Sequence, residues 1–167
     1  MKLVAGFFTI SLFVIIFFST PFDLIYANEV EQLGLPETTV NPGSFYYSFK
    51  RLFEKGQEKL LFFQQSKKSF YESLVKMRLS ELNYVIDKKA LSEVQRSSER
   101  FAYQAGILTE EVIKQNQIND KENLIKEFDR YNKFLSNLRD KYPANSSFWM
   151  LVQHDINTLN ISSNRLK

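Results

Sequence analysis

Residues that interrupt helices are almost absent from most of this chain. From Ser44 to the C-terminus there is one proline, Pro143, and there are two glycines, Gly56 and Gly106. So few turn-forming residues cannot separate the many short strands of a β-sandwich or barrel. The remaining sequence favours helices, and it predicts an all-α fold of about five helices, over residues 44–64, 66–86, 90–117, 119–142 and from 146 onwards.

Apolar residues recur at helical spacing in the predicted helices. Intervals that alternate between three and four residues run from Leu91 to Val112 and from Leu124 to Tyr142, and Gly106 leaves the phase unchanged. Because the connections are only a few residues long, consecutive helices should lie antiparallel in a bundle. We therefore expect the third and fourth helices to form a long antiparallel hairpin that resembles a coiled coil.

The first predicted helix has one strongly apolar side, which we expect to face the core. Its members are Phe45, Phe49, Leu52, Phe53, Leu60 and Phe63, and Ser44 should be its N-cap. Residues 60–63 form a run of four apolar residues that no single helix face can hold. We expect this helix to be buried on two sides, and the alternative is a patch that binds a partner or a membrane surface.

Two charged residues fall within the apolar stripe of the second predicted helix, Arg78 and Glu81. A charge on an apolar face needs a partner, because burying it unpaired is very costly. At about 1.5 Å per residue, Glu54 lies level with Arg78, and Arg51 with Glu81, on either side of a helical hairpin. We expect Glu54 to pair with Arg78, and Glu81 with Arg51 or Lys50, which would make the first helix a central one.

The N-terminus has the order of regions found in secretory signal peptides. A positive Met1-Lys2 start precedes residues 3–18, which carry no charge, and a small residue, Ala27, follows. Residues 1–27 are expected to be a signal peptide, with an uncleaved membrane anchor as the alternative. Residues 28–43 hold glycines and prolines and should be a linker, followed by a helical domain over residues 44–164. Either version places the domain outside the cytoplasm, secreted or anchored to the cytoplasmic membrane and facing outward.

Side chains that commonly carry catalysis or bind metals are scarce. The chain has no cysteine and one histidine, His154, which excludes disulfides, thiolate metal sites and a cysteine nucleophile. His154 points away from the apolar stripe of its predicted helix and should be a surface residue. We expect no catalytic residue, no cofactor and no metal site. The net charge of +3 is too small to indicate a nucleic-acid partner.

A spaced motif crosses the first two predicted helices. It consists of Pro42, Ser44, Tyr47, Lys50, Arg51 and Glu54, followed by an Arg-Leu-x-Glu element at Arg78 and Glu81. Over about residues 35–89 the sequence resembles a bacterial family called domain of unknown function 5667. The resemblance implies export and a helical domain, often in membrane-anchored proteins, and it implies no activity. We expect the motif residues to be structural.

These features favour a non-catalytic interaction module of the bacterial cell envelope. Its partner would be another protein or a second copy of the chain, bound through helix faces, in a location close to the membrane. The alternative is a binder of anionic envelope polymers or lipid headgroups through the basic pairs at residues 50–51, 67–68 and 88–89. We expect those pairs to be solvated, with glutamates interleaved.

Overall fold

The structure, a computed structural model, describes residues 30–61 and 64–167. The chain divides into two compact units, Met1–Gly34 and Leu35–Lys167. The described part of the first unit contains a short helical turn over residues 30–32. The expected signal peptide, residues 1–27, lies outside the described residues. None of the helices that are described is both long and apolar enough to cross a membrane.

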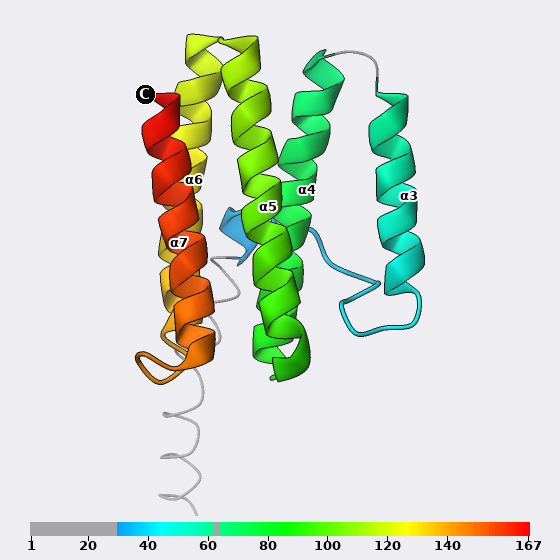
Figure 1. The fold of residues 1–167 in the computed structure, drawn as a ribbon, viewed down its shortest axis with the longest axis vertical. Coiled ribbons are helices and arrows are strands. Elements are labelled where there is room, and N and C mark those ends of the chain that lie inside the picture. Colours follow the sequence, from blue (N-terminus) through cyan, green and yellow to red (C-terminus); the bar gives the residue numbers. More distant parts are fainter. Residues whose placement is uncertain (1–29, 62–63) are drawn as a thin grey trace, which may run out of the picture. The chain divides into compact units, whose positions relative to one another are not determined.

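The second unit is all-α, as expected, with no strand among its described residues. Five helices follow one another along the chain (Figure 1): α3 (Tyr47–Leu60), α4 (Gln64–Asp87), α5 (Leu91–Gln115), α6 (Ile118–Arg139) and α7 (Ser147–Leu166). Each lies within a few residues of a helix expected from the sequence. The helix α5 continues through Gly106 without a break.

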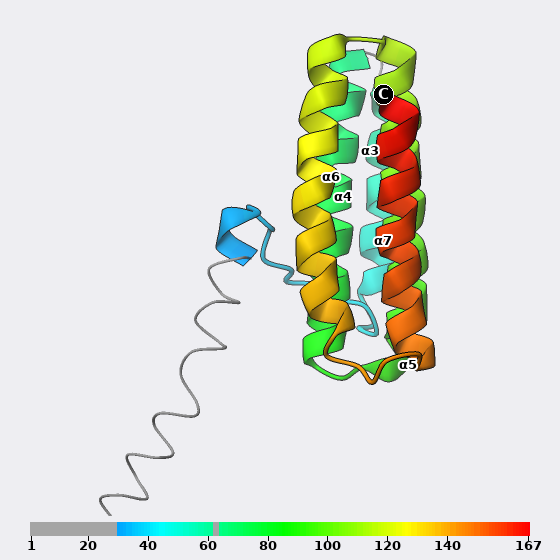
Figure 2. The same ribbon diagram turned by 90° about the vertical axis from the view of Figure 1, so that its left-hand side faces the viewer.

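Helices α4 to α7 form the body of the bundle (Figures 1 and 2). Helices α5 and α6 make the expected antiparallel hairpin, joined at Asn116 and Gln117, where Asn116 takes the left-handed conformation with φ of 53°. The closest backbone packing occurs between α4 and α5, between α5 and α7, and between α6 and α7. Ion pairs between Lys68 and Asp120 (2.6 Å) and between Lys76 and Glu127 (3.2 Å) connect α4 to α6.

The alternating apolar stripes of α5 and α6 form much of the core. Ten of their apolar residues are buried, and α7 adds three from its own stripe. They are Val94, Phe101, Ala105, Leu108 and Val112 on α5, Leu124, Phe128, Tyr131, Leu135 and Leu138 on α6, and Val152, Ile156 and Leu159 on α7. Helix α4 is buried on more than one side, through Leu74, Val75, Leu79, Leu82, Val85 and Ile86. It is therefore α4, and not α3, that occupies a central place in the bundle.

Helices α7 and α3 are capped differently at their N-termini. Ser146 caps α7, and its hydroxyl accepts a hydrogen bond from the backbone N–H of Trp149 (3.3 Å). Ser44 does not cap α3, because that helix begins at Tyr47 and its N-cap is Tyr46, whose side chain makes no capping hydrogen bond. The turn before α3 is instead closed through the backbone, where the N–H of Tyr47 donates to the carbonyl of Ser44 (3.1 Å).

Part of the expected linker belongs to the helical unit. Residues from Leu35 onwards fall in the same compact unit as the helices, and Pro42 is buried. The Ser80 hydroxyl of α4 donates to the carbonyl of Pro36 (2.7 Å), and the Lys50 ammonium of α3 donates to the carbonyl of Val40 (3.2 Å). The segment over residues 35–43 is therefore fixed to α3 and α4.

Candidate functional site

Two charged residues lie on the buried side of α4 that faces α3. Arg78 and Glu81 are each only 1% exposed. They are one helical turn apart, and Nη1 of Arg78 contacts both carboxylate oxygens of Glu81, at 2.8 and 2.7 Å. A pair this deeply buried loses its hydration, so further hydrogen bonds are needed to stabilise it.

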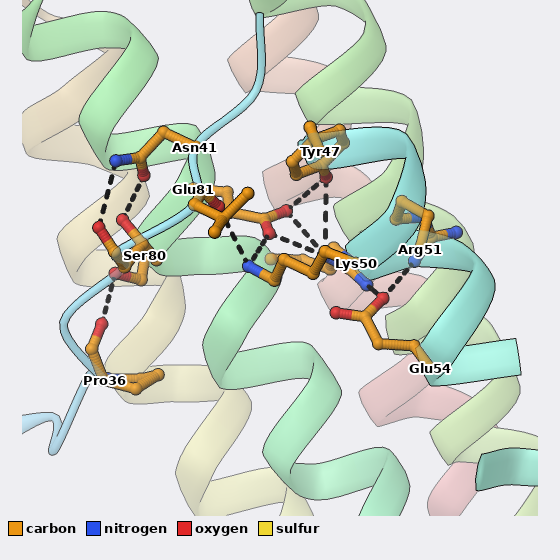
Figure 3. A network of polar contacts seen from close by, with 11 residues as sticks. Pro36, Asn41, Tyr47, Lys50, Arg51, Glu54, Ser80 and Glu81 are labelled. Atoms are coloured by element: carbon orange, nitrogen blue, oxygen red, sulfur yellow. Dashed lines mark hydrogen bonds and ion pairs between the residues drawn. The ribbon is translucent and has the colours of Figure 1, made fainter. Parts of the chain in front are cut away.

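Helix α3 supplies those hydrogen bonds (Figure 3). The second terminal nitrogen of Arg78 donates to Glu54, and Nζ of Lys50 lies 2.6 Å from Oε1 of Glu81. Arg51 in turn donates to Glu54 at 2.9 Å. The structure thus contains the Glu54–Arg78 pair expected from the register, and it selects Lys50 rather than Arg51 as the partner of Glu81.

Tyr47 also belongs to this network, although the sequence analysis did not predict a contact between Tyr47 and the charged residues. Its hydroxyl donates to Oε2 of Glu81 at 2.7 Å, and the guanidinium of Arg100, on α5, lies 4.9 Å from the centre of its ring. Tyr47 is three residues before Lys50 and seven before Glu54, so helical spacing places it on the same side of α3. That helical spacing is the sequence signal from which its place in the network could have been inferred. We call the set Tyr47, Lys50, Arg51, Glu54, Arg78 and Glu81 the ionic network.

The electrostatics of the ionic network favour its charged forms. Burial alone would raise the pKa of Glu81, but Arg78, Lys50 and Tyr47 outweigh that effect and hold the pKa below its usual value. Burial would lower the pKa of Arg78, and the two carboxylates raise it instead. Burial and the carboxylate of Glu81 also raise the pKa of the Tyr47 hydroxyl, which therefore remains a donor.

The apolar side of α3 points away from the other described helices. Six large apolar residues of α3 and the turn before it are between 63 and 81% exposed: Phe45, Tyr46, Phe49, Leu52, Phe53 and Leu60. We call them the α3 apolar face. The expectation that this side faces the core, and that α3 is covered on both sides, is wrong within this chain. The reason is the ionic network, which requires the opposite side of α3 to face Arg78 and Glu81.

Long polar side chains, rather than close helix packing, hold α3 in place. Helix α3 is not among the helix pairs whose backbones pack closely. A further link joins its second half to α4, where the hydroxyl of Tyr71 donates to Glu58 at 2.8 Å, and burial together with Glu58 raises the pKa of Tyr71 to about 12. A cavity of about 80 Å³ remains between α3 and α5, bordered by Arg51, Lys55 and Tyr103 among others. It is well below the size of ordinary small-molecule sites.

The ionic network offers little for chemistry. Its two carboxylates are both engaged by cations, so neither is available as a general base without breaking an ion pair. No group of three or more His, Cys, Asp or Glu residues that could hold a metal occurs in the part of the chain that the structure describes. What the arrangement can do is fix the position of α3 and determine which of its sides faces outward.

Two adjacent titratable residues of α7, His154 and Asp155, differ in their exposure to solvent. His154 is exposed, as expected from its spacing. Asp155 is fully buried, and neither of its carboxylate oxygens accepts a hydrogen bond from the described residues. Burial raises the pKa of Asp155 well above its usual value, and the nearby Ser98 hydroxyl opposes this only in part. The only sequence signal for this buried acid is its spacing from Val152 and Ile156.

Comparison with known protein families finds a match that includes this motif. The sequence model of the family described as domain of unknown function (DUF5667) matches residues 39–141, from the segment before α3 to the end of α6. This is more than half of the chain, and it includes all six residues of the ionic network. No curated protein and no solved structure matches significantly. The chain belongs to the DUF5667 family.

Proposed function

We propose that this chain is a non-catalytic, exported or membrane-anchored interaction module of the bacterial cell envelope. The observation that carries the proposal is the α3 apolar face, which stays exposed while the opposite side of the same helix is docked. A side of a helix that presents four aromatic residues and two leucines to water is unfavourable unless something covers it.

The size of the α3 apolar face supports binding. Aromatic side chains bury about 150–250 Å² each, so the four aromatic residues of this face, at these exposures, alone present on the order of 500 Å². Contiguous apolar patches above a few hundred Å² on soluble proteins mark interaction sites. Other exposed apolar residues, such as Ile118, Met150 and Ile161, come from separate elements and need no special explanation.

The alternative function, binding of anionic polymers through the basic pairs, has less support. Lys50 and Arg51 are engaged by Glu81 and Glu54, and Lys68 is engaged by Asp120 and Glu72. Lys88 and Lys89 are exposed, and two lysines at the end of one helix are a common surface feature. A polymer site would have to compete with ion pairs that already exist in the fold.

Site-specific photo-crosslinking in living cells would test the proposal. A photoreactive amino acid at Phe49 should give adducts, whereas the same group at Ile161, which is similarly exposed on α7, should give few. Because both positions are exposed, neither change should alter stability by more than about 0.5 kcal/mol. Equal, background-level labelling from both positions would contradict an interaction role for the α3 apolar face.

A further inference from the structure

The exposed charges of α3 itself are all of one sign. Helix α3 carries four basic residues and two acidic ones, but the two acids are turned inward. Glu54 is buried in the ionic network, and Glu58 is partly buried and accepts a hydrogen bond from Tyr71. The exposed charges of α3 are Lys55 and Lys59. The outward side of the helix is therefore aromatic and cationic, with no exposed carboxylate.

The two lysines border the apolar residues rather than interrupt them. At about 100° per residue, Phe49 and Leu60 lie near the centre of the α3 apolar face and Leu52 lies at one edge, beyond which Lys59 and then Lys55 follow. A helix with Phe and Leu on one side and lysines beside them is typical of segments that lie in the plane of a membrane surface. The lysine stems can extend so that the ammonium groups reach lipid phosphates while the rings enter the headgroup region.

We infer that the α3 apolar face docks onto the surface of an anionic lipid bilayer, with Phe45, Phe49 and Phe53 inserted between headgroups. This inference rests on the proposed function and names the partner of the same surface. Helix α3 lies at the edge of the helical unit, beyond α4 (Figure 1), so a flat surface can reach it without disturbing the core.

Charge complementarity favours a bilayer over a second copy of the chain. Two copies of α3 placed face to face would bring lysines together with no exposed carboxylate on α3 to pair with them, and like charges across an interface are unfavourable. Anionic lipids supply the missing negative charge, because they attract basic residues that lie near the membrane surface.

The order of segments along the chain fits this arrangement. Residues 3–18 form the uncharged apolar segment of the sequence, and α3 is the first long helix after it. If that segment stays in the membrane, α3 is the nearest of the five helices along the chain, which raises its effective concentration at the bilayer surface.

Tryptophan fluorescence of the full chain in lipid vesicles would test the inference. Trp149 is the single tryptophan, so a Trp149→Phe background allows a reporter to be placed by Phe49→Trp, with Ile161→Trp as the matched control on α7. In vesicles of phosphatidylglycerol with brominated acyl chains, the Phe49→Trp reporter should be quenched at least twofold more than the control. Adding Lys55→Glu and Lys59→Glu, or using neutral phosphatidylcholine, should abolish most of that difference.

Three results would overturn the inference. Equal quenching of the reporter and the control would mean that the α3 apolar face does not enter the bilayer. A difference that persists unchanged in neutral lipid would remove the role of the lysines. A blue shift without lipid quenching, rising with protein concentration, would identify a second copy as the occupant. In this last case crosslinking from Phe49 would still succeed, so the proposed function would survive.

Discussion

Replacing Arg78 by alanine should be among the most destabilising single changes in this chain. Its guanidinium is 1% exposed and contacts Glu54, Glu81 and the Tyr47 hydroxyl. Removing one partner of a buried ion pair costs about 3–5 kcal/mol, because the remaining charge stays buried. Glu81 keeps Lys50 and Tyr47 as partners, so we expect a loss near the lower end, about 3 kcal/mol.

Urea unfolding followed by circular dichroism would measure this loss, and a double-mutant cycle with Glu54→Gln would isolate the pair. We expect a coupling energy of about 1–3 kcal/mol between the two positions. Arg165 provides the matched control, because it lies 2.7 Å from Glu110 but both side chains are about half exposed. Arg165→Ala should cost less than about 1 kcal/mol. A coupling energy below about 0.5 kcal/mol, or equal losses for Arg78→Ala and Arg165→Ala, would refute the reasoning.

Four further predictions concern pH, the core and export. Burial raises the folded-state pKa of Asp155. Its contribution to stability is therefore present below the unfolded pKa of about 4 and is lost as pH rises. Replacing it in Asp155→Asn should raise the urea midpoint at pH 7 and not at pH 4. The pKa of Glu81 is lowered on folding, so its contribution to stability is present above about pH 4 and lost in acid. Hydrogen exchange should therefore show α3 opening before α5 and α6 as pH falls. Phe101→Ala and Leu135→Ala should each cost about 2–5 kcal/mol in urea melts, since both side chains are fully buried; losses below about 1 kcal/mol would place these stripes outside the core. Ala27→Arg should block processing of an exported precursor, and N-terminal sequencing of the secreted protein would show a different mature start if another bond is cut.

Much of the fold could be predicted because it depends on local information. The near absence of Gly and Pro after Ser44 and the helical spacing of apolar residues were enough to predict the helices and the α5–α6 hairpin. The Glu54–Arg78 pair could be predicted because the rise per residue fixes which positions are level in a hairpin. The misplaced N-cap at Ser44 arose because the preceding residues fold back onto α3 and α4, a contact that local spacing does not reveal.

The sequence by itself determined that α3 is amphipathic, with an aromatic side and a charged side. Only the tertiary structure decided which side faces inward. An amphipathic helix usually docks through its apolar side, because that buries the most apolar area. Here the neighbouring surface of α4 carries the buried pair of Arg78 and Glu81, whose remaining hydrogen bonds are supplied by Tyr47, Lys50 and Glu54 from the charged side of α3. The charged side of α3 therefore faces α4, and its phenylalanines remain exposed to solvent or to a partner.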